Sequence, residues 1–189
     1  MAQGQTVDLH VELPNTVKAI RDGWNWTSTS GAVVSGLLAG GAAQLLSTFK
    51  GDMDLMNREP RDRNLVLVLC YAALFLNISA TISSFILTDN LGELEYNTAK
   101  GRGGVNTTQM LGGEATILKA HGASPSWEFM LYHWLITFYS GILSLIMSVL
   151  SYVWLVEARS IAVTMSVIVG FTLLPTTYFI LLRPFLEFR

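Results

Sequence analysis

The fold is decided by residues 129–156, FMLYHWLITFYSGILSLIMSVLSYVWLV, which contain no Asp, Glu, Lys or Arg. Three further stretches are equally free of charge, at residues 31–49, 64–88 and 160–182. A helix rises about 1.5 Å per residue, so about 20 residues cross a hydrocarbon core about 30 Å thick. The four stretches therefore predict an all-α membrane protein, folded as a bundle of four transmembrane helices.

Other fold classes agree less well with the composition. Hydrophobic residues make up 51% of the chain, and the mean hydropathy is +0.43. The buried helices of a soluble protein still need polar faces for water, and the four stretches have only narrow polar stripes. A transmembrane β-barrel would show segments of about ten residues with alternating hydrophobicity, and the sequence lacks them.

The segments between the stretches suggest the domain organisation. Residues 1–30 are expected to be a tail in which a short amphipathic helix begins at Pro14 and lies at the membrane interface, anchored by Trp24 and Trp26. This helix either positions the chain before the first span or senses the membrane specifically. Residues 31–189 are expected to form one transmembrane domain, in which residues 89–128, with seven glycines, are a flexible loop.

The distribution of charged residues agrees with a location in a lipid bilayer but does not determine the orientation of the chain. The net charge is −2 and no basic run is typical of a nucleic-acid surface, so we expect no nucleic-acid partner. Basic residues are more numerous on the side of the two termini, which favours cytoplasmic termini, whereas the flanks of the first span favour the reverse. Glycosylation sequons begin at Asn25 and Asn106 on the terminal side. The sequence does not indicate which membrane holds the chain.

The first span carries two adjacent rows of small residues. Lipid tails are as apolar as leucine, so helices in membranes associate where small side chains let their backbones approach closely. The span is therefore expected to pack against neighbouring helices or against a second copy of the chain, which would make a homo-oligomer. The rows are formed by Ala32, Gly36 and Gly40, and by Ser35, Ala39, Ala43 and Ser47.

Polar side chains follow one face of the second span and one face of the third. Polar faces in lipid turn inward, so the two faces are expected to share a seam. One interpretation makes the seam a conduit or ligand pocket, and the other makes it helix packing in which hydroxyls bond their own backbone. The candidate seam residues are Asn77, Thr81, Ser84, Thr88, His133, Thr137, Ser144 and Ser148.

The sequence contains no recognisable catalytic or cofactor site. No span contains an acidic residue or a lysine, and no nucleophile elbow or phosphate-binding glycine loop occurs. The single cysteine, Cys70, excludes a cysteine-based metal cluster, and His133 is expected to belong to an interfacial belt with Trp127, Tyr132 and Trp134. We therefore expect no catalytic residues, no metal and no cofactor. The leading hypothesis is a non-enzymatic structural or interaction component; the alternative is a channel or transporter subunit passing a small solute along the seam.

Three segments resemble uncharacterised multi-pass membrane proteins of mushroom-forming fungi. They are residues 76–93 (LNISATISSFILTDNLGE), residues 133–135 (HWL) and residues 170–175 (GFTLLP). The resemblance implies a fungal multi-pass membrane protein, and no activity is assigned to that group.

Overall fold

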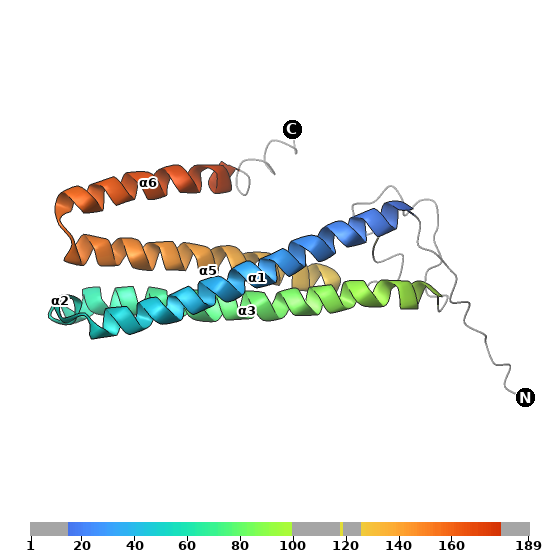
Figure 1. Ribbon diagram of the computed structural model, residues 1–189, viewed down its shortest axis with the longest axis horizontal. Helices are drawn as coiled ribbons and strands as arrows, with labels where there is room; N and C mark the ends of the chain where they lie inside the picture. Colours follow the sequence, from blue (N-terminus) through green and yellow to red (C-terminus); the bar gives the residue numbers. More distant parts are fainter. Residues whose placement is uncertain (1–14, 100–117, 119–125, 179–189) are drawn as a thin grey trace, which may run out of the picture. The chain divides into compact units, whose positions relative to one another are not determined.

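The computed structural model describes residues 15–99, 118 and 126–178, and every regular element in this part of the chain is a helix (Figure 1). The helices α1, α3 and α5 are long and apolar enough to cross a membrane, and α6 is a shorter apolar helix. The all-helical fold is therefore confirmed for the described residues, with three helices that could span a membrane, while the fourth crossing stays a prediction. The elements are α1 (Asn15–Gly51), α2 (Met53–Met56), α3 (Pro60–Ala99), α5 (Trp127–Val156) and α6 (Arg159–Thr177).

The described part of the tail and the first span lie in one continuous helix, α1, while the interfacial position of the tail stays a prediction. Residues 24–31 contain no proline, and a single glycine costs a helix only about 1 kcal/mol. The Thr27 hydroxyl donates to the Gly23 carbonyl at 3.0 Å, so this polar segment bonds along the helix. Residues 1–14 of the predicted tail lie outside the described part of the chain.

Helix α3 continues beyond the predicted end of the second span, so residues 89–99 of the predicted loop are helical. Leu87, Leu91 and Leu94 repeat at helical spacing and are buried, which keeps this segment on the helix despite Asp89 and Gly92. The absence of charge marks where a helix crosses hydrocarbon and does not mark where the helix ends. The remainder of the loop, including Asn106, lies outside the described residues apart from Leu118.

The chain forms two compact units, and α1, α3 and α5 each contribute to both. Unit 1 consists of Met1–Ala39 and Phe75–Ser140, and unit 2 consists of Gly40–Leu74 and Gly141–Arg189. The core of unit 1 is formed by side chains from α1, α3 and α5 together with Leu118. Its buried members are Val17, Ala80, Leu87, Leu91, Leu94, Leu118, Trp127 and Trp134.

The core of unit 2 gathers Phe49, Leu55, Val66 and Cys70. Leu55 belongs to the short helix α2, which lies between α1 and α3 in Figure 1. Asp52 caps α2 by accepting hydrogen bonds from the amides of Asp54 and Leu55, at 2.8 and 3.4 Å. The cap fixes the turn after α1 and brings Leu55 into the core.

Candidate functional site

Ser35 of α1 and Thr81 of α3 join two helices of unit 1. Their hydroxyl oxygens are 2.8 Å apart, and either can be the donor. Each hydroxyl can also donate to its own helix, Ser35 to the Gly31 carbonyl at 2.7 Å and Thr81 to the Asn77 carbonyl at 2.9 Å. The Ser35 hydroxyl also lies 3.3 Å from the Ala32 carbonyl, so two protons are shared among four possible hydrogen bonds, and the bond between the helices forms at the expense of a backbone bond. A contact of this kind contributes about 0.6 kcal/mol to helix association.

A second polar contact joins α3 and α5 in unit 1. The Ser83 hydroxyl lies 2.9 Å from Nδ1 of His133, which stacks on Phe129 with ring centroids 6.4 Å apart. Ser83 is buried, whereas His133 is half-buried. His133 was expected to belong to an interfacial belt, and in the structure Trp127 and Trp134 are buried in the core while Tyr132 is 64% exposed. The histidine thus bonds a serine that the predicted seam does not include.

The predicted seam residues of unit 1 differ in their surroundings. Asn77, Ser84 and Thr137 are buried, whereas Thr81 and Thr88 are half-buried. The Thr137 hydroxyl donates to carbonyls of its own helix, at 2.8 Å to His133 and 3.0 Å to Trp134. The hydrogen bonds described for these residues connect Thr81 to α1 and satisfy Thr137 within α5, which is typical of helix packing.

Several buried polar atoms of unit 1 have no hydrogen-bond partner within the described part of the chain. They are the hydroxyl oxygens of Ser28 and Ser84 and the indole nitrogens of Trp127 and Trp134. A buried polar atom without a partner costs about 1–3 kcal/mol, and ordered water commonly supplies the missing bond. The interior of unit 1 therefore has both packed contacts and hydrogen-bonding capacity that the described residues do not satisfy.

The last two predicted seam residues, Ser144 and Ser148, lie in unit 2. Ser148 is fully buried and donates to the Val66 carbonyl of α3 at 2.9 Å, while Ser144 is half-buried. The Cys70 thiol similarly donates to the Ala42 carbonyl of α1 at 3.3 Å. Both are single contacts that bond one helix to the backbone of another.

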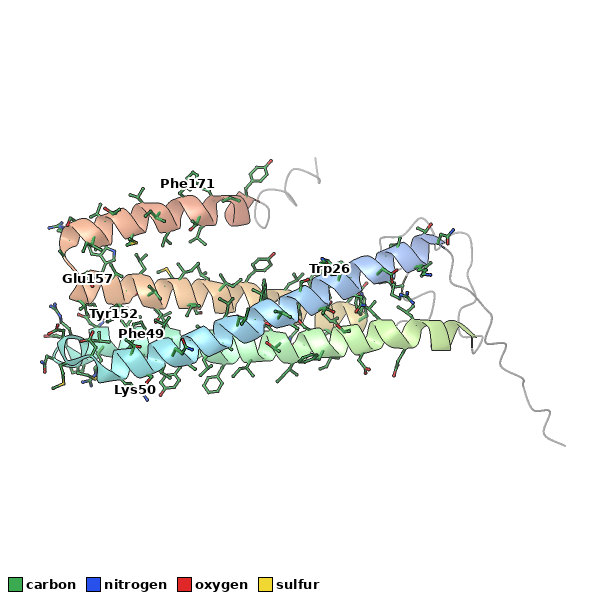
Figure 2. All side chains as sticks on the ribbon, viewed as in Figure 1. Trp26, Phe49, Lys50, Tyr152, Glu157 and Phe171 are labelled. Atoms are coloured by element: carbon green, nitrogen blue, oxygen red, sulfur yellow. The ribbon has the colours of Figure 1, made fainter. Side chains whose placement is uncertain are left out.

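A cluster of polar and aromatic side chains lies at the end of α1 in unit 2 (Figure 2). Phe49 and Tyr152 stack with ring centroids 4.6 Å apart and planes 25° from parallel. The Tyr152 hydroxyl donates to the Asp52 carboxylate and lowers the pKa of that carboxyl below its ordinary value of 3.8, although desolvation opposes the shift. Lys50 donates to the Tyr71 hydroxyl at 2.7 Å. The carboxylate thus stabilises both α2 and the end of α5.

The small residues of α1 occupy two different faces. Ala32, Ser35 and Ala39 are buried, whereas Gly36, Gly40 and Ala43 are exposed. A Cβ atom built on Gly36 or Gly40 would meet no described atom within 4 Å. The buried residues Ala32, Ser35 and Ala39 are separated by three and then four positions, which is the spacing of residues that face a neighbouring helix. Each predicted row therefore contributes residues to both the buried and the exposed face. The exposed small residues are therefore not used by packing among the described residues.

Sequence reasoning did not find Ser83, which follows Ser79 by four residues on a row beside the predicted seam. Ser35 was assigned to small-residue packing, and in the structure it also makes a polar contact. The spacing of serines along α3 was visible in the sequence, but the partner of each serine depends on which row faces α5.

Comparison of the chain with protein-family models, with curated proteins and with solved structures finds no match. In the described residues, no three His, Cys, Asp or Glu side chains come close enough together to hold a metal ion.

Proposed function

We propose that the protein is a non-enzymatic structural or interaction component of a membrane, with four transmembrane helices, and that it self-associates through the exposed small residues of α1. The exposed face of α6 supports a lipid environment for this helix, since Val167, Phe171 and Leu174 are 68%, 75% and 63% exposed. The uncharged stretch of residues 160–182 would be about 35 Å long as a helix, enough to cross the hydrocarbon core.

The observation that carries the self-association proposal is the open face at Gly36 and Gly40. Hydrophobic burial does not drive helices together in lipid, so close packing at small residues is the main source of affinity. The chain's own helices contact the adjacent strip of α1, at Ala32, Ser35 and Ala39. Gly36, Gly40 and Ala43 remain for a second α1, with Leu37 beside them.

Replacing Gly36 and Gly40 together by isoleucine is expected to convert the oligomer of the purified full chain to a monomer. Branched side chains there would hold two α1 backbones apart. The measurement is the protein mass in detergent micelles, from light scattering coupled to size exclusion over a range of protein-to-detergent ratios.

The matched control for this experiment is Gly170→Ile in α6, because Gly170 is also an exposed helical glycine with no described atom near its Cβ position. This variant is expected to keep the wild-type mass. A wild-type protein that is monomeric at every ratio, or a double variant with unchanged oligomer mass, would contradict the proposal.

The alternative function is a channel or transporter subunit, and it is favoured by the buried hydroxyls of Ser28 and Ser84, which have no hydrogen-bond partner in the described part of the chain. Two buried hydroxyls and an indole nitrogen of Trp134 supply hydrogen bonds that a line of water molecules would use. The packed contacts of Ser35 with Thr81 favour the structural function instead.

Glycerol flux into liposomes containing the purified protein separates the two functions. For the structural component we expect a rate equal to that of protein-free liposomes. A conduit would give a faster rate that falls in Asn77→Leu, which removes a buried polar side chain, and is unchanged in Asn25→Leu, which alters an exposed one. Flux with this dependence would replace the structural function by transport.

A further inference from the structure

We propose that the groove between α3 and α5 of unit 1 binds a sterol, whose hydroxyl forms a hydrogen bond with His133. This goes beyond the proposed function and rests only on its membrane location. The groove has a volume of about 420 Å³, within the range of about 300–1,000 Å³ that is usual for small-molecule sites. Its wall is formed mainly by Phe75, Ile78, Ile82 and Ile86 of α3 and by Phe129 and Met130 of α5.

The wall of the groove contains a hydrogen-bonded pair of side chains, Ser83 and His133. Ser83 is 3% exposed, and its hydroxyl lies 2.9 Å from His133 Nδ1. A serine hydroxyl that donates to Nδ1 leaves the proton of a neutral imidazole on Nε2. Nε2 has no hydrogen-bond partner in the part of the chain that the structure describes, and His133 lines the groove. If instead Nδ1 donates to Ser83, Nε2 is an acceptor. In both cases Ser83 orients the imidazole, and a hydroxyl, which both donates and accepts, can bond Nε2.

The position of Ser83 and His133 in the groove suits an amphiphile that enters from the membrane boundary. Asp89 lies just beyond Ile86, and Glu128 precedes Phe129, so the charged end of the groove lies at that boundary. From Ser83 the groove continues to Phe75, eight residues or about 12 Å along the helix, between side chains that are apolar except for Ser79. An occupant with a polar head at His133 and an apolar body toward Phe75 fits both parts.

The chemistry of the wall favours a neutral head. All the residues that line the groove are uncharged. An ionised head at this depth would lose hydration without gaining an opposite charge, which is strongly unfavourable. A hydroxyl loses less hydration and can form a hydrogen bond with Nε2 in either tautomer.

Competition from the lipids of the bilayer favours an occupant with a rigid ring system. Acyl chains of bulk lipid reach the same wall, so a specific occupant needs features that those chains lack. A sterol supplies a hydroxyl near the membrane boundary, and its fused rings have little conformational freedom to lose on binding. The flat side chains of Phe75 and Phe129 and the branched isoleucines form a stiff wall for such a ring system.

The test uses the purified full chain in phosphatidylcholine liposomes with a diazirine-bearing cholesterol analogue. Light-driven labelling is expected within residues 75–86 or 129–133 and to be competed by cholesterol. The hydrocarbon 5-cholestene and the flexible oleyl alcohol are expected to compete at least about five-fold less well, because each lacks either the hydroxyl or the rigid body.

Two variants test the site, and each has a matched control. His133→Phe removes the hydrogen-bonding imidazole and Ile82→Trp fills the groove, and each is expected to reduce competable labelling about five-fold or more. Tyr132→Phe removes a hydroxyl at the same depth, and Ile136→Trp adds the same bulk; both residues are exposed and lie outside the groove wall. These two controls are expected to label like the wild type.

Equal labelling in all variants, labelling outside both segments, or equal competition by 5-cholestene would overturn the site. Equal competition by oleyl alcohol would overturn the sterol as its occupant. Size exclusion and circular dichroism identify any variant that fails to fold, and either His133→Phe or Ile82→Trp alone is sufficient for the test.

Discussion

Replacing Phe49 by alanine is expected to lower the free energy of unfolding by about 3–5 kcal/mol, the usual range for removing a fully buried aromatic side chain. Phe49 is only 2% exposed and stacks on Tyr152 in the core of unit 2. Its removal leaves a cavity beside Leu55 and Cys70 and ends the stacking, which itself contributes about 0.5–1.5 kcal/mol. Unfolding is measured by circular dichroism during titration of detergent micelles with sodium dodecyl sulfate.

The matched control is Phe171→Ala in α6, because Phe171 is 75% exposed (Figure 2). Its side chain contacts few protein atoms, so the free energy of unfolding is expected to change by less than about 0.5 kcal/mol. Similar losses for Phe49→Ala and Phe171→Ala would show that the packing of unit 2 does not depend on the buried ring.

Replacing Gly31 by alanine is expected to lower the free energy of unfolding by about 1–2 kcal/mol, although alanine is the better helix former by about 1 kcal/mol. A Cβ atom on Gly31 would lie 2.5 Å from Cζ2 and 3.3 Å from Cε2 of Trp134. Trp134 is 3% exposed and rigid, so α1 and α5 must shift apart to admit the methyl group. The same titration measures the loss.

Gly92→Ala in α3 is the control for this second prediction. No described atom lies within 4 Å of its Cβ position, so helix propensity alone acts, and the free energy of unfolding is expected to rise by up to about 1 kcal/mol. Trp134→Phe combined with Gly31→Ala is expected to recover part of the loss, because the smaller ring leaves room for the methyl group. Equal effects of Gly31→Ala and Gly92→Ala would contradict the close contact with Trp134.

The helices were predictable because a segment that crosses the hydrocarbon core has to be long, apolar and free of charged residues. The predicted third span, residues 129–156, and helix α5 (Trp127–Val156) differ by two residues. The prediction was less accurate where a helix leaves the hydrocarbon, since α3 continues through Asp89 and Glu93 to Ala99. Water and lipid headgroups tolerate charge on a helix, so charge does not mark the end of α3.

The candidate sites were predictable only as rows of residues. Sequence placed Ser35 with the small residues of the first span and His133 with the polar residues of the third. In the structure Ser35 bonds Thr81, and His133 bonds Ser83, which lies on a row beside the predicted one. Neighbouring rows of one helix are only a few ångströms apart, and the sequence of that helix does not determine which row faces its neighbour.

By itself the sequence determined that this is an all-helical chain with long apolar helices, because only segments that satisfy their own backbone hydrogen bonds and carry no charge are stable in lipid. Tertiary structure alone decided how those helices are used. It turned Ala32, Ser35 and Ala39 inward and left Gly36 and Gly40 open. It also set His133 against Ser83 in the wall of a groove. These choices depend on the rotation and register of one helix against another, and packing between helices fixes both.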